Sequence, residues 1–124
     1  MIYLSIKLER NEKMKKLFKC SVCNYIHEGT SAPDSCPKCG APASAFQELD
    51  EATTKKVYES DETNDLLMEL ASTASKLIVL CERGIELKLD PACVSCFEKS
   101  KNALWSMKQN AKAEIQNHIA KSKW

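Results

Sequence analysis

The chain lacks two features that would direct it to a membrane or a nucleic acid. No apolar run reaches the roughly 18 residues that a transmembrane helix needs, and the opening MIYLSIKLERNEK is too short and too charged for a secretory signal. The formal net charge is only +1, so there is no overall attraction to nucleic acid or to an anionic membrane surface. We therefore expect a cytoplasmic protein that binds neither.

Glycine and proline are scarce, and they are unevenly distributed. The chain has three glycines and four prolines in 124 residues, and only Gly84 and Pro91 lie outside residues 17–49. This clustering is typical of a small module of loops held together by something other than a large core. The predicted organisation is an N-terminal extension (1–16), a metal-binding module (17–49), a linker (50–60) and a helical domain (61–124).

In the opening residues, MIYLSIKLE, apolar and polar side chains alternate as they do in a short β-strand. Met14 is a second plausible translation start, and it begins the segment MKKLFKCSVC. We therefore expect residues 1–13 to be a dispensable extension.

The second half of the chain predicts two long helices. The first has Ser60 or Asp61 as its N-cap and ends at Gly84, and the second starts at the Asp90 cap with Pro91 in the first turn and runs to about Lys121. The expected apolar stripes are Leu67, Leu70, Ala74, Leu77 and Cys81 on the first helix, and Cys93, Phe97, Leu104, Ala111, Ile115 and Ile119 on the second.

Two such helices joined by a short loop make an antiparallel helical hairpin. A hairpin alone buries apolar residues on one side only, so we expect a homodimer that pairs the helices into a four-helix bundle. The alternative is that the helices pack on the metal-binding module.

Seven cysteines are present, an odd number arranged mainly in Cys-x-x-Cys pairs. This suits metal or redox thiols better than a secreted disulfide framework. Cys20, Cys23, Cys36 and Cys39 form two pairs, and each pair is followed by a residue, Asn24 or Gly40, that tolerates a left-handed turn. Two such turns face to face would give tetrahedral sulfur coordination of zinc or iron. Four free thiols or two disulfides are the alternatives.

The segment LFKCSVCNYIHEGTSAPDSCPKCGAPASAF closely resembles the rubredoxin-like domain of rubrerythrins. The resemblance rests on Cys20, Cys23, Tyr25, His27, Glu28, Gly29, Ala32, Pro33, Cys36, Pro37, Cys39, Gly40, Ala41, Pro42 and Phe46. It implies one iron held by the four cysteines and cycling between ferric and ferrous states, with zinc as the alternative metal. Asn24 departs from the family, which has glycine there, and this change could shift the reduction potential. We expect Phe18, Tyr25 and Phe46 to form a miniature core, and His27 to be no ligand.

Four protein ligands leave no open position for a substrate, so the metal can hold the fold or pass electrons. In full-length rubrerythrins the electrons go to a di-iron centre built from Glu and Glu-x-x-His motifs on a four-helix bundle. No Glu-x-x-His occurs in this chain, where His118 follows Glu114 at the wrong interval. We therefore expect no enzyme activity and a separate redox protein, a reductase or an acceptor, as the partner.

A third Cys-x-x-Cys, Cys93 with Cys96, lies in the expected first turns of the second helix, and Cys81 lies near the end of the first. Three roles are open for these cysteines: small core residues, a redox-active pair with one additional thiol, or part of a second metal site.

The predicted fold is thus a small metal-stapled rubredoxin-like β module followed by an all-α helical hairpin. The favoured function is one-electron transfer. One alternative is a zinc-stapled interaction protein that binds its partner through the helical hairpin. The other is a redox- or metal-dependent sensor.

Overall fold

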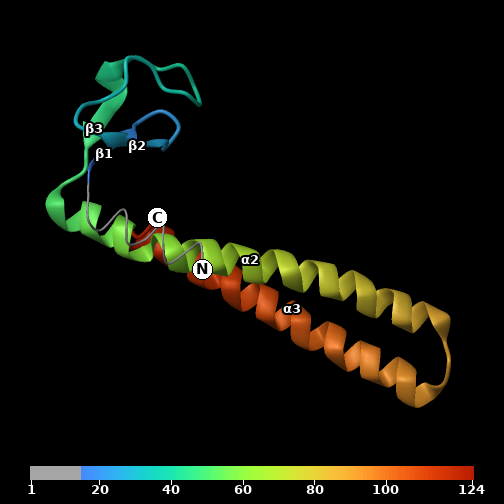
Figure 1. Cartoon of the computed structure of the whole chain (residues 1–124). Helices are drawn as coiled ribbons and strands as arrows, with labels where there is room; N and C mark the ends of the chain where they lie inside the picture. Colours follow the sequence, from blue (N-terminus) through green and yellow to red (C-terminus); the bar gives the residue numbers. More distant parts are fainter. Residues whose placement is uncertain (1–14) are drawn as a thin grey trace. The chain divides into compact units, whose positions relative to one another are not determined.

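The computed structural model describes residues 15–124, which form two compact units that divide between Glu59 and Ser60 (Figure 1). The expected opening strand and the dispensable residues 1–13 lie outside the described part. The elements in chain order are β1 (Lys16–Cys20), β2 (Ile26–Gly29), a 3-10 turn η1 (Ala43–Ala45), β3 (Phe46–Glu48), α2 (Glu51–Leu87) and α3 (Pro91–Ala120). The predicted fold class, a small β module followed by two helices that pack together, is confirmed.

The N-terminal unit contains a three-stranded sheet in the order β2-β1-β3, with both neighbours antiparallel to β1. Phe18 pairs with His27 on β2, and Cys20 pairs with Phe46 on β3. Phe18 and Cys20 share one face of β1, since side chains alternate along a strand. Cys20, the first of the predicted metal-ligating cysteines, therefore lies at the end of the central strand, beside the module's aromatic residues.

The core of this module is very small. Phe18, Cys20, Cys36 and Phe46 are its buried members, and Tyr25 packs against them. The predicted miniature core is confirmed. Two of its four buried residues are cysteines, so few apolar side chains are available to stabilise the loops between the strands.

Helix α2 begins earlier than the sequence predicted. Asp50, and not Ser60 or Asp61, caps it: the Asp50 carboxylate accepts a hydrogen bond from the Thr53 N–H at 2.7 Å. The residues expected to form a linker are the first turns of this helix. Their exposed face is charged, but Tyr58 is buried and its hydroxyl donates to the Lys15 carbonyl at 3.0 Å. This tertiary contact outweighs the modest helix propensity of the local sequence.

Gly84 does not end α2, which continues to Leu87. The prediction that the helix stops at Gly84 is wrong, because this glycine has a role in packing and not in ending the helix. Gly84 is buried, and the ring of Phe97 from α3 occupies the space that a β-carbon would fill. The chain turns at Lys88–Asp90 instead, where Lys88 has a positive φ of 47°.

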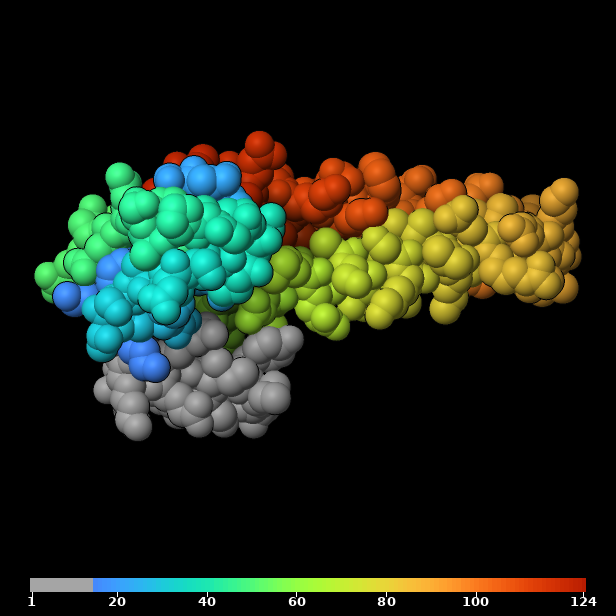
Figure 2. Space-filling view, turned by 90° about the horizontal axis from the view of Figure 1, so that it is seen from above, coloured from blue at the N-terminus to red at the C-terminus, as the bar shows by residue number. Residues whose placement is uncertain are grey.

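Helix α3 follows the sequence prediction at its start. The Asp90 carboxylate accepts a hydrogen bond from the Cys93 N–H at 2.8 Å, and Pro91 occupies the first turn. Residues 60–87 of α2 and helix α3 lie side by side and run in opposite directions (Figures 1 and 2). In the part of the chain that the structure describes, no helix is long and apolar enough to cross a bilayer.

The fully buried positions in the seam between the two helices are small or polar residues, while the predicted stripe residues Leu67, Phe97, Leu104 and Ile115 are half-buried. Asn64, Ala74, Cys81 and Ala111 are buried, and a hydrogen bond joins Asn64 to His118. The predicted stripes are therefore only partly correct. Ala74, Cys81 and Ala111 lie in the seam, whereas Leu70, Leu77 and Ile119 are exposed. The small seam residues let the helices approach closely, and the leucines are left on another face.

Candidate metal centre

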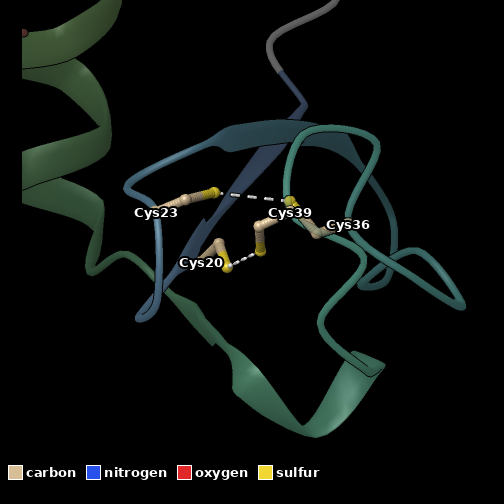
Figure 3. Close-up of side chains that lie close together, drawn as sticks. All are labelled: Cys20, Cys23, Cys36 and Cys39. Atoms are coloured by element: carbon tan, nitrogen blue, oxygen red, sulfur yellow. Dashed lines mark hydrogen bonds between the residues drawn. The ribbon is translucent and has the colours of Figure 1, made fainter.

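All four predicted metal-ligating cysteines come together in the N-terminal unit. Their sulfur atoms lie within 4.8 Å of one another (Figure 3). Cys20 Sγ lies 3.7 Å from Cys39 Sγ, and Cys23 Sγ lies 3.5 Å from Cys36 Sγ. Each close pair thus joins one Cys-x-x-Cys turn to the other, so the two turns face each other across a shared centre.

These distances match one metal and exclude disulfides. A disulfide needs a sulfur–sulfur distance near 2.0 Å, and all seven cysteines are free. In a tetrahedral site with metal–sulfur bonds of about 2.3 Å, neighbouring sulfurs are about 3.8 Å apart. The close pairs are near that spacing, so the four cysteines are positioned to bind a metal ion. Zinc and iron both accept such a set of thiolates.

The two Cys-x-x-Cys turns have the same backbone hydrogen bonds. In the first, the Cys20 N–H donates to the Tyr25 carbonyl at 2.8 Å and the Asn24 N–H donates to the Cys20 carbonyl at 2.9 Å. In the second, the Cys36 N–H donates to Ala41 at 2.8 Å and the Gly40 N–H donates to Cys36 at 2.9 Å. The sequence spacing therefore encodes one local structure twice.

Both turns need a residue with positive φ directly after the second cysteine. Asn24 has a φ of 70° and Gly40 has a φ of 76°, as the sequence predicted. Asparagine is one of the few side chains that tolerate this region, and glycine enters it without a steric penalty. The Asn24 departure from the family pattern thus preserves the backbone conformation.

Backbone N–H groups point at the sulfur of the first cysteine in each turn. Burial raises the pKa of the Cys36 thiol, but hydrogen bonds from the Cys39 and Lys38 N–H groups outweigh it, and the pKa falls to about 6. Such bonds stabilise negative charge on sulfur, which is the form that binds a metal.

The first turn repeats this pattern and shows the repulsion among the thiols. Burial raises the pKa of Cys20, but hydrogen bonds from the Cys23 and Val22 N–H groups leave it below the ordinary value. Burial also raises the pKa of Cys23, to about 12, and the thiol neighbours Cys36 and Cys39 contribute in the same direction. Four thiolates this close repel one another unless a cation compensates them.

The two cysteines of each turn differ in exposure. Cys20 and Cys36 are buried, Cys23 is half-buried and Cys39 is exposed. His27 takes no part in the sulfur cluster: its ring lies 6.4 Å from that of Phe18, and its Nε2 lies over Gly29. This agrees with its predicted role as a non-ligand.

The other three cysteines form no comparable cluster. Among residues 15–124 the four N-terminal cysteines are the only group positioned to hold a metal. Gly84 lies opposite Phe97, and Glu82 pairs with Lys101 at 3.9 Å. Cys81 is therefore expected to lie opposite Lys101, more than a helical turn away from Cys93.

Comparisons with known proteins agree with the geometry of the N-terminal unit. Residues 18–47 match the family model of the rubrerythrin, rubredoxin-like domain. The reverse rubrerythrin-1 of Clostridium acetobutylicum is 56% identical over 36 residues, which cover 29% of this chain and 19% of that protein. The rubrerythrin of Nitratidesulfovibrio vulgaris is 47% identical over 32 residues, which cover 26% of this chain and 17% of that protein.

These matches span less than a fifth of each relative and do not extend over the helical hairpin. No solved structure matches the chain. Residues 18–47 are thus a rubredoxin-like domain of the rubrerythrin type, with four cysteines positioned for a metal.

Proposed function

We propose that the protein is a one-electron carrier whose rubredoxin-like domain holds a single iron through Cys20, Cys23, Cys36 and Cys39. The observation that carries this proposal is the match of residues 18–47 to the rubrerythrin type of domain, because a generic zinc site requires only the cysteines and not the residues around them. Iron bound there would exchange one electron between its ferric and ferrous states.

The arrangement of the chain around the sulfurs supports this role. Four thiolates complete a tetrahedral site, so no position remains for a substrate or an activated water. The N–H groups directed at Cys20 and Cys36 stabilise negative charge on the sulfurs and so favour the more negative, reduced site. The exposed Cys39 offers a short path from the site to a docked partner.

The partner in this proposal is a separate redox protein, and the chain itself is not an enzyme. The two relatives are rubrerythrins, but the helical half of this chain contains no Glu-x-x-His motif. The proposed compartment is the cytoplasm, where thiols stay reduced and available for metal binding.

A zinc-stapled interaction protein is the second candidate. Its supporting observation is the number of large apolar side chains that remain exposed on the helices, among them Leu80, Val79 and Trp105. In that case the metal would only hold the module together, and the hairpin would be the binding surface.

Absorption spectroscopy with metal analysis separates the two candidates. We expect the purified protein to contain one iron per chain and to show sulfur-to-iron charge-transfer bands that bleach with dithionite and return in air. Cys39→Ser should remove or strongly alter these bands, and Cys96→Ser, a matched exposed cysteine outside the site, should leave them unchanged. A colourless protein with one zinc per chain, in which iron reconstitution produces no reversible bands, would overturn the carrier proposal.

A further inference from the structure

Helix α2 carries a row of exposed leucines. The row, here called the leucine stripe, consists of Leu66, Leu70, Leu77, Leu80 and Leu87, which are 41–62% exposed. The residues of α2 that are buried in the seam with α3, Ala74 and Cys81, lie on a different side of the helix. Because successive residues of an α-helix are about 100° apart, the leucine stripe lies on a separate face, roughly at a right angle to the seam with α3.

The spacing of the leucine stripe is that of a coiled-coil seam. With Thr73 included, the positions from 66 to 80 advance by four, three, four and three residues, which is the a/d pattern of a heptad repeat. A helix with a strict repeat of this kind typically packs along a second helix, whereas leucines scattered singly over a protein surface show no such period. The stripe therefore fits another long helix.

Four charged residues flank the leucine stripe on the side away from α3. Glu62, Glu69, Lys76 and Arg83 follow one another at intervals of seven, so they share one edge, the g position of the heptad. The first two are acidic and the last two are basic. The opposite edge, the e position, holds Leu67, Ala74 and Cys81 and is uncharged.

This order of charges makes the edge complementary to itself when a second α2 runs in the opposite direction. Antiparallel coiled coils bring g positions of the two helices together. With the two-fold axis between residues 71 and 72, Glu69 faces the partner's Lys76 and Glu62 faces the partner's Arg83. The same register places Leu66 against the partner's Leu77. It also places Leu70 against the partner's Thr73 and Leu80 against the partner's Thr63. One alignment thus pairs the four charges and covers the leucines nearest the two-fold axis.

A parallel arrangement gives no such match. Parallel coiled coils pair g with e positions, so each charge would face the uncharged edge. Within α2, Arg83 also pairs with Glu86 at 3.3 Å, so a dimer would add the partner's Glu62 to an existing ion pair. A different protein could cover the leucines, but the self-complementary order of charges favours a second copy of this chain.

We propose that the protein is a homodimer whose two α2 helices pack antiparallel along the leucine stripe, with Glu62 and Glu69 paired to the partner's Arg83 and Lys76. Dimerisation does not depend on which metal the N-terminal unit binds, so the dimer proposal can be tested independently of the electron-carrier proposal. It is the specific form of the homodimer expected from the unpaired helical hairpin.

Charge reversal in two complementary variants tests this arrangement. Glu62→Lys with Glu69→Lys makes the edge wholly basic, and Lys76→Glu with Arg83→Glu makes it wholly acidic. Each variant alone should dissociate, with a dimer dissociation constant raised on the order of a hundredfold, because four favourable contacts become repulsive. An equimolar mixture of the two should form a mixed dimer. Light scattering after size-exclusion chromatography and sedimentation across a dilution series measure the mass.

A matched control reverses two exposed charges on α3, Lys99→Glu with Lys112→Glu, and should leave the dimer intact. Far-UV circular dichroism confirms that every variant remains helical. The proposal is overturned if the wild type is monomeric, if both edge variants remain dimeric, or if both become monomeric and their mixture does not associate. The metal content of each sample is recorded separately, so failure of iron binding is distinguishable from failure of dimerisation.

Discussion

The ring of Phe97 lies directly against the backbone of Gly84: a β-carbon at position 84 would clash with ring atoms Cγ, Cδ2 and Cε2 of Phe97. Of these atoms, Cγ is held close to the α3 backbone. The glycine is thus a packing residue in the last turns of α2, near the loop of the hairpin, where glycine is intrinsically unfavourable in a helix.

Gly84→Ala tests this contact. Alanine would favour the helix by about 1 kcal/mol, but displacing the Phe97 ring in a packed seam should cost about 1–3 kcal/mol. We expect net destabilisation in urea unfolding. In a double-mutant cycle with Phe97→Leu, which frees the space, the alanine should become neutral or stabilising. An equal effect of Gly84→Ala in both backgrounds would contradict the contact.

The Asp90 cap offers a second prediction. Its carboxylate accepts the Cys93 N–H bond at the start of α3, so Asp90→Ala should lower the free energy of unfolding by about 1 kcal/mol. Asp90→Ser retains a capping oxygen and is the matched control, expected to lose much less. Thermal unfolding followed by circular dichroism provides the measurement, and equal losses in the two variants would argue against the cap.

Asp50 should make the stability of the protein depend on pH. The Thr53 N–H holds the pKa of the Asp50 carboxyl below its ordinary value of 3.8. Because the folded-state pKa is the lower one, the contribution is complete above the ordinary value and is lost as the pH falls through the folded pKa.

Asp50→Asn keeps an acceptor for the cap but does not ionise. The difference in the free energy of unfolding between wild type and variant should therefore shrink from about pH 5 to about pH 3. Measuring the difference between two proteins cancels the effect of acid on the shared metal site. A difference that stays constant with pH would contradict this role of Asp50.

Asn24 occupies a left-handed turn in which few side chains are stable. Asn24→Val should destabilise the metal-bound module by about 1–2 kcal/mol, since a β-branched residue is strained at positive φ. Asn24→Gly, the conservative comparison, should be close to neutral. Denaturant unfolding followed by near-UV circular dichroism, or at the sulfur-to-iron bands where iron is bound, measures both. Similar behaviour of valine and glycine would show that the turn relaxes.

Metal removal should unfold one unit and spare the other. The small core around Phe18 and Phe46 includes the ligands themselves, so a chelator should remove the protection of residues 15–49 from amide exchange. The seam between α2 and α3 lies in the other unit, and most helical circular dichroism should persist. Retained protection of residues 15–49 in the metal-free protein would contradict this expectation.

Much of this structure could be predicted from local patterns in the sequence. The spacing of the cysteines with Asn24 and Gly40 predicts both turns, since each turn is formed by adjacent residues. Asp90 and Pro91 likewise predict the start of α3. These features depend on interactions within a few residues.

The features that were missed depend on distant partners. The early start of α2 depends on Tyr58 reaching Lys15, and its charged first turns otherwise resemble a linker. The role of Gly84 depends on where Phe97 lies, which local sequence does not reveal. The expected apolar stripe of α2 mixed seam residues with exposed leucines, because two faces one residue apart share the same periodicity.

The unequal burial of the cysteines in each turn has a consequence for oxidative damage. Reagents in solution reach the exposed Cys39 sulfur more readily than those of Cys20 and Cys36, which are closed off by the module's aromatic residues. Oxidation by peroxide or alkylation therefore begins at Cys39. Loss of that one sulfur would open the four-cysteine site from its outer side, so the resistance of a bound metal to oxidants would be set by the most exposed of its four sulfurs.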